Sequence, residues 1–484
     1  MAKDILFIIS DQHSYKLQGY AGNRIVRTPN LDRLAESGTV MNDCYAACPL
    51  CVPSRLSLLS GRYPSEIRAL TNDASLDSNV ATFVHSLNAS GYDTTLCGRM
   101  HFVGPDQRHG FIKRLVGDIT PTTLKKGWNR DGLGVLPWNR GRIEHLAIQC
   151  MGGGDSTVLE YDRDVTQAAV DFLSKNYDVP QFLCVGMYAP HFPYIAPKEL
   201  FDYYYDKVVI PEESFHGDEH PVFKGKLRDK DEETVRAAMA AYYGMTEFMD
   251  QNVGKILDAW ENYLQRTGRE GIAVYVSDHG DSNGEHGFYG KNTFFDPSVH
   301  VPMIFSGSGI PEGKEIHSPV SLLDLGPTFC DIAGAMLPPK QKGISLVGAM
   351  EGTESDDDRI VISELINRFG VSSIGRMAKW KNYKYVTFSG FPDADQLFDL
   401  EKDPYETKNI IGENREIAGK LSLYIRDNLK CPETVMEEID ELKANTDIIS
   451  RCRQEIKDEW KIREGMAEDA PSPMISTKIQ VSFR

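Results

Sequence analysis

Short apolar segments recur along the chain, and they are separated by stretches with the spacing of helices. Such segments, each four to six residues long, occur at residues 5–9, 93–96, 182–187 and 272–276. Runs of this length, alternating with helical patterns, are typical of buried strands in a largely parallel sheet. We therefore predict an α/β fold with a large, mostly parallel central sheet flanked by helices.

Polar residues follow each predicted strand directly. In chain order these residues are Asp11 and Gln12, Arg99 and His101, His191, and Asp278 and His279. In open α/β sheets the ligand crevice lies beyond the carboxyl ends of the strands. The pattern therefore predicts one shared polar site at that edge.

The remaining pattern predicts helices and a division of the chain. Residues 30–37 and 231–264 have helical periodicity, and residues 320–329 indicate a turn entering another core helix. Composition changes near residues 352–358, and residues 360–363 and 383–388 resemble strands of a second unit. We predict a catalytic α/β domain at 1–355, a small C-terminal α+β subdomain at 356–430 and a helical tail at 431–484. The tail is either an oligomer arm or a solvated surface helix.

Composition and charge narrow the class of protein. The 484 residues include 53 Lys and Arg against 70 Asp and Glu, which gives a net charge of −17. Such a surface repels nucleic acid and anionic membranes at long range. The nine cysteines are scattered and odd in number, which is not typical of a disulfide framework. The apolar run at residues 5–9 is too short for a secretory signal, and no stretch approaches the roughly 18 apolar residues of a membrane span. We expect a cytoplasmic protein without nucleic acid or membrane partners.

The strongest local signal is at residues 51–62, Cys-Val-Pro-Ser-Arg-Leu-Ser-Leu-Leu-Ser-Gly-Arg. Cys51 precedes an apolar helical run, and the N-terminus of a helix favours an anion. Arg55, four residues later, projects to the same side and offers a forked donor to an oxyanion. Two other interpretations are a small buried cysteine and a zinc half-site with Cys48, for which the chain has no partner Cys-x-x-Cys.

This segment resembles the signature of the type I sulfatases, which belong to the alkaline phosphatase superfamily. Further segments from residue 4 to about residue 410 are similar to other signatures of that family: Asp11-Gln12, residues 91–94 with 98–101, residues 277–280 with Glu285 and Lys291, and residues 396–409. Residues 100–111 resemble the choline sulfatase and phosphonate monoester hydrolase branch. Arg99 stands where the family usually has lysine, which keeps the charge but changes its reach.

The resemblance implies an alkaline phosphatase-like fold and two cofactors. Cys51 would be oxidised to formylglycine by a formylglycine-generating enzyme, which is then a protein partner. A divalent metal would be held by Asp11, Gln12, Cys51, Asp278 and His279. The carboxylates suit Ca²⁺. Histidine is a softer ligand than Ca²⁺ prefers, so Mn²⁺ is an alternative metal.

The resemblance also implies a nucleophilic mechanism. One hydroxyl of the hydrated formylglycine attacks sulfur and expels the alcohol, and the second then loses its proton so that sulfate leaves and the aldehyde reforms. Arg55, Arg99 and Lys291 would hold the hydrate and the sulfate oxygens. His101 would act as the base for sulfate release and His191 as the general acid for the leaving alcohol.

Further residues are assigned to substrate binding. We expect His191 and Lys291 to contact the substrate, and Asn72 either lines the sulfate pocket or forms a turn. Asp106 and His109 either shape recognition or brace their loop. The outer wall of the pocket is expected to come from loops such as residues 120–138.

These features together predict a sulfatase that hydrolyses a small alkyl or sugar sulfate. The alternatives are a phosphonate monoester or phosphodiester hydrolase on the same site, and a binding protein whose cysteine is never converted. We expect the substrate to be a small-molecule sulfate ester. The sequence does not decide whether the protein forms a homo-oligomer.

Overall fold

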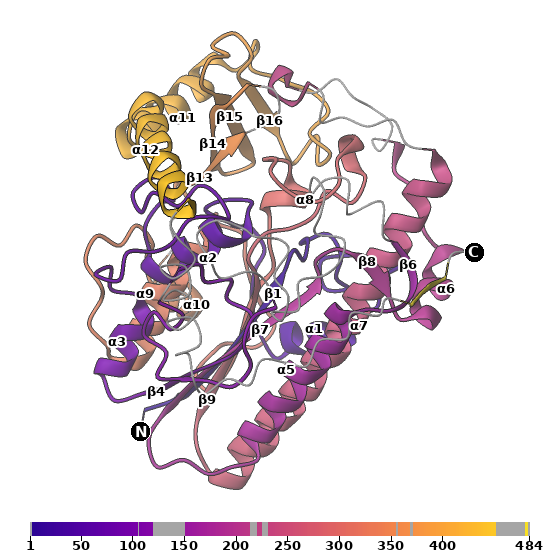
Figure 1. The fold of residues 1–484 in the computed structure, drawn as a ribbon, viewed down its shortest axis with the longest axis vertical. Coiled ribbons are helices and arrows are strands. Elements are labelled where there is room, and N and C mark those ends of the chain that lie inside the picture. The colour runs from indigo at the N-terminus through magenta and orange to yellow at the C-terminus, as the bar shows by residue number, and fades with distance from the viewer. Residues whose placement is uncertain are drawn as a thin grey trace.

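The computed structural model describes residues 2–104, 106–119, 151–212, 220–224, 231–354, 357–367, 371–451 and 480–482. Within these ranges a large sheet forms the centre of the molecule (Figure 1). Its eight strands lie in the order β11 (Lys314–Ile316), β2 (Gly38–Met41), β10 (Met303–Gly307), β9 (Gly271–Ser277), β1 (Asp4–Asp11), β7 (Gln181–Pro190), β4 (Asp93–Gly98) and β5 (Lys113–Arg114). β10 is antiparallel to both of its neighbours and the other pairings are parallel, which confirms the predicted mostly parallel sheet.

The four segments predicted as strands are neighbours in this sheet, in the order β9, β1, β7 and β4. In register, Ile5 pairs with Phe182 on one side and with Ile272 on the other. All four strands run in the same direction, so their carboxyl ends lie along one edge of the sheet. The polar residues that follow them are therefore brought to the same edge.

Helices cover both faces of the sheet. Successive side chains of a strand point to opposite faces, so the apolar residues of one buried strand pack against both groups of helices. Leu6 and Ile8 of β1 pack with helices on one face, α1 (Pro29–Glu36), α5 (Thr157–Leu173), α6 (Lys198–Tyr205) and α7 (Glu232–Thr267). Ile5, Phe7 and Ile9 pack with those on the other, α2 (Cys51–Ser60), α3 (Phe83–Ala89), α9 (Leu325–Ala333) and α10 (Val347–Glu351). Figure 1 shows α5 and α7 on one side of the sheet and α3, α9 and α10 on the other.

A second, antiparallel sheet forms the C-terminal α+β subdomain at the top of Figure 1. Its strands lie in the order β13 (Ile360–Asn367), β14 (Ser373–Trp380), β15 (Tyr383–Phe388) and β16 (Gln396–Asp399). The sheet packs against α11 (Arg415–Asn428), and α12 (Pro432–Ser450) follows it. The backbone N–H of Glu364 in β13 donates to the carbonyl of Ala47 at 2.9 Å, which ties this sheet to the segment preceding α2.

Shorter elements complete the fold. They are the pair β3 (Cys44–Tyr45) and β12 (Val320–Ser321), the sheet of β17 (Gln480–Ser482), β6 (Met151–Asp155) and β8 (Tyr194–Ala196), helix α8 (Asp296–Val299), and the 3₁₀ turns η2 (Pro221–Phe223), η3 (Glu285–Gly287) and η4 (Leu322–Asp324). In the described part of the predicted tail, α12 is a helix and β17 pairs with β6. An oligomer arm stays a prediction. None of the helices in the described ranges combines the length and the apolar character needed to cross a membrane.

Candidate active site

A compact group of metal-binding side chains lies where β1, β9 and α2 meet. Asp11 ends β1, Asp278 and His279 follow β9, and Cys51 begins α2. One ligand atom from each of these four residues lies within 4.8 Å of the others, and all four residues are buried. The structure thus brings together residues that are far apart in the sequence, at the sheet edge where the pattern placed them.

The first turn of α2 fixes the position of Cys51. Pro53 is tolerated there because the first turn of a helix has no acceptors for its N–H groups. The N–H of Val52 donates instead to the side-chain Oδ1 of Asn72 at 3.0 Å. Asn72 therefore supports the helix that carries Cys51, and its contact with a substrate stays a prediction. The helix ends at Gly61, whose φ of 66° is left-handed and favours glycine.

Ser54 and Arg55 attach this helix to the two strand ends. The hydroxyl of Ser54 donates to the carbonyl of Asp278 at 2.6 Å. The Arg55 guanidinium donates to Asp278 at 2.8 Å and to Asp11 at 3.2 Å, and its third nitrogen donates to the carbonyl of Arg99 at 3.1 Å. Arg55 is fully buried. It holds the two carboxylates side by side, whereas direct contact with a sulfate oxygen stays a prediction.

The donor set fits a divalent cation. The two carboxylates supply hard oxygen ligands. His279 Nδ1 lies 2.9 Å from the carbonyl of Gly280, which requires its proton on Nδ1. When the ring is neutral, as a metal ligand must be, its lone pair is on Nε2, which faces Asp11 and Asp278 at 3.7 Å each. A histidine fixed in this tautomer by a backbone carbonyl is a usual arrangement for a metal ligand.

Lys291 reaches the same group from the loop after β9. Its Nζ lies 3.0 Å from the Cys51 sulfur and donates to Gln12 Oε1 at 2.7 Å. Gln12 Nε2 donates in turn to Asp281. Gln12 thus lies beside the donor group, where its amide connects Lys291 to a buried carboxylate. Its role as a metal ligand stays a prediction.

The Cys51 thiol lies among positive charges. Its sulfur is 3.2 Å from His279 Nε2 and 3.0 Å from Lys291 Nζ. Burial raises the pKa of this thiol, but the charges of Lys291 and His279 act in the opposite direction and hold the pKa well below its usual range. The site therefore stabilises negative charge at the side chain of residue 51.

Arg99 has a partner for each of its guanidinium nitrogens. It pairs with Asp11 at 2.5 Å and Asp118 at 3.2 Å, and it donates to His101 Nδ1 at 2.7 Å. Its guanidinium also lies 4.4 Å from the ring centroid of Tyr188. A planar fork suits three such partners better than a lysine ammonium does. This geometry gives a physical reason for arginine at position 99.

The two remaining histidines face the cluster from other strands. Burial and the Arg99 charge lower the pKa of His101 to about 4, so its ring is neutral and accepts from Arg99 through Nδ1. His191 follows β7, and its Nε2 lies 4.0 Å from Asp11 Oδ1. Its Nδ1 lies 2.6 Å from the carbonyl of Phe192. Burial and the Lys291 charge lower the pKa of His191.

Residual exposure distinguishes an outer layer of this site from its floor. Asp11 and Arg55 have no exposed area. Lys291, His191 and His101 keep 5%, 6% and 7% of theirs. The three partly exposed side chains thus form the outer layer of the site, and the carboxylates and Arg55 form its floor.

Two buried carboxylates at this site are not predicted by the sequence pattern. Asp118 accepts from Arg99 and from the backbone N–H of His101, the latter at 2.9 Å. Asp281 accepts from the backbone N–H groups of Asn283 and Gly290, which shapes the loop leading to Lys291. Asp281 lies two residues after His279, a proximity that could have drawn attention to it, whereas nothing in the sequence around Asp118 indicates its role.

Two other predicted features lie at or beyond the margin of the site. Asp106 Oδ1 accepts from the backbone N–H groups of Arg108 and His109, both at 2.9 Å. These bonds brace the loop, and a part in recognition stays a prediction. The loop at residues 120–138 lies outside the described residues.

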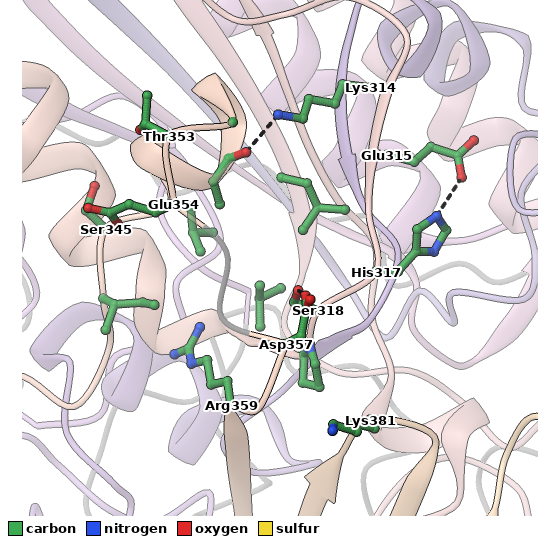
Figure 2. Close-up of a pocket in the computed structure, with 17 residues that line it drawn as sticks. Lys314, Glu315, His317, Ser318, Ser345, Thr353, Glu354, Asp357, Arg359 and Lys381 are labelled. Carbon is green, nitrogen blue, oxygen red and sulfur yellow. Dashed lines mark hydrogen bonds and ion pairs between the residues drawn. The ribbon is translucent and has the colours of Figure 1, made fainter.

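A cavity of about 1080 Å³ lies elsewhere, between β11, α10 and the start of the C-terminal sheet (Figure 2). Two of its cationic side chains already have partners. Arg359 binds both carboxylate oxygens of Asp324, at 2.7 and 2.6 Å, and Lys314 donates to carbonyls at the end of α10. The described lining offers no nucleophile beside a donor cluster, so the chemistry is better placed at the edge of the central sheet.

Comparison with known proteins bears on the class of protein and on its fold. The profile of the sulfatase family matches residues 3–335, and that of the C-terminal region of N-sulphoglucosamine sulphohydrolase matches residues 284–430. The chain is 32% identical to a choline-sulfatase of Rhizobium meliloti (strain 1021), over 90% of this chain and 88% of that protein. It is 28% identical to arylsulfatase K of Bos taurus, over 89% and 82%. The structure of a phosphonate monoester hydrolase of Agrobacterium radiobacter aligns with a TM-score of 0.70 and 23% identity, over 92% of this chain and 96% of that one, which supports the fold.

Proposed function

The chain belongs to the sulfatase family of sulfuric ester hydrolases, and we propose that it cleaves a small alkyl or sugar sulfate to an alcohol and inorganic sulfate. The observation that carries the proposal is the position of Cys51. Its sulfur contacts Lys291 and His279 beside two buried carboxylates, at the start of a helix. This is a place where a nucleophilic oxygen on residue 51 could be both activated and positioned.

The surroundings of Cys51 fit its conversion to formylglycine. The Lys291 ammonium is positioned to hydrogen-bond an oxygen that replaces the sulfur, and His279, as a metal ligand, would hold the cation beside that oxygen. The hydrated aldehyde would supply the hydroxyl that attacks sulfur, together with the second hydroxyl that allows sulfate to leave. A maturation enzyme that generates formylglycine is accordingly the protein partner that the proposal requires.

The metal would be held by Asp11, Asp278 and His279 next to residue 51, with Ca²⁺ first and Mn²⁺ as the alternative. A divalent cation there would lower the pKa of a hydroxyl bound to it. Burial and the negative charge of Cys51 raise the pKa of Asp11. The positive charges of Arg99, His191 and Arg55 outweigh these effects and hold the pKa below its ordinary value, so this carboxyl stays ionised. An ionised ligand favours cation binding.

The outer layer of the site would hold the substrate. Lys291 supplies a charge toward the sulfate oxygens, and His101 supplies a ring whose Nδ1 is occupied by Arg99. A neutral ring in that state has its proton on Nε2 and donates a hydrogen bond. His101 therefore acts first as a donor to the anion. It can act as a base for sulfate release only after that proton has moved.

His191 would protonate the leaving alcohol. The Phe192 carbonyl holds a proton on Nδ1, so Nε2 carries one only in the imidazolium form. A bound sulfate anion favours that form, because a nearby negative charge raises the pKa of a histidine. Nε2 faces the cluster, where the departing oxygen would lie.

Paired turnover of an aryl sulfate and an aryl phosphonate monoester tests the proposed function. The protein is coexpressed with a formylglycine-generating enzyme and loaded with metal, and kcat/KM is compared for the two substrates. We expect a clear preference for the sulfate, and a panel of sugar and choline sulfates then identifies the alcohol. A clear preference for the phosphonate would replace the proposal with a phosphonate monoester hydrolase, since the same cations fit both tetrahedral anions.

The variant His191→Ala tests the general acid. We expect kcat for alkyl sulfates to fall by roughly 10²- to 10⁴-fold, and kcat for activated aryl sulfates to fall far less, because a phenolate with a low pKa leaves without a proton. The measurement is kcat across a series of leaving groups. Equal losses along the whole series would remove His191 from this role.

A further inference from the structure

Strand β7 contains a bulge next to the active site. Ile9 of β1 pairs with Gly186 of β7, and the next pairing joins Asp11 to Pro190. The register thus advances by two residues on β1 and by four on β7. A bulge frees backbone groups from the ladder and re-aims the side chains that follow it.

The freed N–H groups are bound by one buried side chain. The N–H of Tyr188 donates to Asp162 Oδ1 at 2.7 Å, and that of Ala189 donates to Asp162 Oδ2 at 2.8 Å. Asp162 lies on α5 and is fully buried. One carboxylate therefore satisfies two consecutive backbone donors from another element.

The bulge carries two groups that face the reacting centre. The Tyr188 ring lies 4.4 Å from the Arg99 guanidinium, and His191 Nε2 lies 4.0 Å from Asp11 Oδ1. The backbone N–H of His191 donates to the carbonyl of Tyr188 at 3.1 Å, so the two residues are mechanically linked. A displacement at Tyr188 and Ala189 would move both.

Burying a carboxylate this deeply costs free energy unless the charge is paired and hydrogen-bonded. The hydrogen bonds of the Asp162 carboxylate within the described part of the chain come from backbone amides and not from a cationic side chain. Burial raises the pKa of Asp162 to about 7, even though the two amides act in the opposite direction. An asparagine could accept from only one of the two amides.

We propose that Asp162 is a positioning residue that holds the β7 bulge, and through it sets His191 against Asp11 and Tyr188 beneath Arg99. The inference rests on the proposed function, since it gives His191 the task of protonating the leaving alcohol. Asp162 itself lies outside the donor group of Asp11, Cys51, Asp278 and His279, and its carboxylate binds backbone amides of the bulge.

The test uses Asp162→Asn in the matured, metal-loaded full chain. We expect kcat for an alkyl sulfate to fall by about 10- to 100-fold, because small displacements of a catalytic group have effects of this size. The loss on an activated aryl sulfate should be clearly smaller. The readout is the ratio of the two rates in one preparation, which does not depend on the fraction of protein that is folded. Asp162→Ser, which keeps one acceptor, is measured alongside so that the test does not depend on one variant.

Thr166→Val is the matched control. Thr166 is buried one turn further along α5, and its hydroxyl donates to the carbonyl of Asp162 at 2.6 Å and not to the bulge. We expect this variant to keep the wild-type ratio. Equal losses on both substrates in the Asp162 variants would overturn the inference, provided that His191→Ala changes the ratio. If His191→Ala leaves the ratio unchanged, the general acid assignment itself is wrong, and the positioning role fails with it.

Discussion

Cys51→Ala is expected to lower kcat for sulfate ester hydrolysis by roughly 10⁴- to 10⁶-fold, as removal of a catalytic nucleophile generally does. The variant keeps the start of α2 intact, because the N–H of Val52 is still accepted by Asn72. What it removes is the side chain that contacts both Lys291 and His279 and that the proposed maturation converts to an aldehyde. The measurement is turnover of an aryl sulfate by protein coexpressed with a formylglycine-generating enzyme.

Cys48→Ala is the control for this prediction. Cys48 is also a buried thiol, three residues earlier in the chain, and it packs in an apolar cluster with Tyr45 and Phe295. We expect its kcat to match the wild type after maturation. Mass spectrometry of the peptide containing residue 51 should show that sulfur has been exchanged for an aldehyde oxygen in the wild type and in Cys48→Ala, but not in Cys51→Ala. Equal, near-zero turnover of matured wild type and Cys51→Ala would instead support a binding protein whose cysteine is never converted.

Much of the site could be predicted because parallel strands end at one edge. The apolar runs located β9, β1, β7 and β4, and their order in the sheet makes them neighbours. Asp11, Asp278 and His279 follow two of these strands, and the helix signal at Cys51 brought the fourth donor to them. Local patterns suffice here, since each residue occupies the end of an element that the sequence defines clearly.

The support around the site could not be predicted, because it depends on contacts between distant elements. Asp162 lies in the middle of a helix, and its partners are backbone amides of a bulge that no periodicity reveals. Asp118 meets Arg99 across a loop. The sequence predicts the side of the helix on which Arg55 lies, but it does not identify the groups that its guanidinium binds. In the structure these groups are the carboxylates of Asp11 and Asp278.

That pairing explains how two carboxylates can be buried together. Asp11 and Asp278 have no exposed area, and like charges so close would repel one another in a medium of low dielectric constant. Arg55 lies between them with ion pairs of 3.2 and 2.8 Å. We therefore expect the arginine to hold the ligand geometry ready for the proposed cation, which would reduce the reorganisation that binding requires.

Asp278→Asn is expected to remove the metal and to lower kcat by roughly 10³-fold, since Lewis-acid assistance contributes several kcal/mol and each 1.36 kcal/mol is a factor of ten. The amide keeps the shape of the side chain but not its charge. Asp278 Oδ1 already accepts from the backbone N–H groups of Gln12 and His279, at 3.0 and 2.9 Å, and Oδ2 accepts from Arg55. Elemental analysis of the purified variant measures the metal directly, alongside turnover with added Ca²⁺ or Mn²⁺.

Thermal unfolding gives a readout of this site that is independent of catalysis. A ligand that binds only the folded state stabilises it by about 2.7 kcal/mol at a hundredfold excess over Kd. Chelated wild type should therefore gain Tm when Ca²⁺ is restored, and Asp278→Asn should not. Asp162→Asn is the control, because its carboxylate lies outside the donor group, and we expect it to bind metal normally and to gain Tm like the wild type. If wild type stripped of metal keeps its full activity and shows no gain in Tm with Ca²⁺ or Mn²⁺, the cluster of Asp11, Asp278 and His279 is a buried ion-pair network that supports residue 51 and not a metal centre.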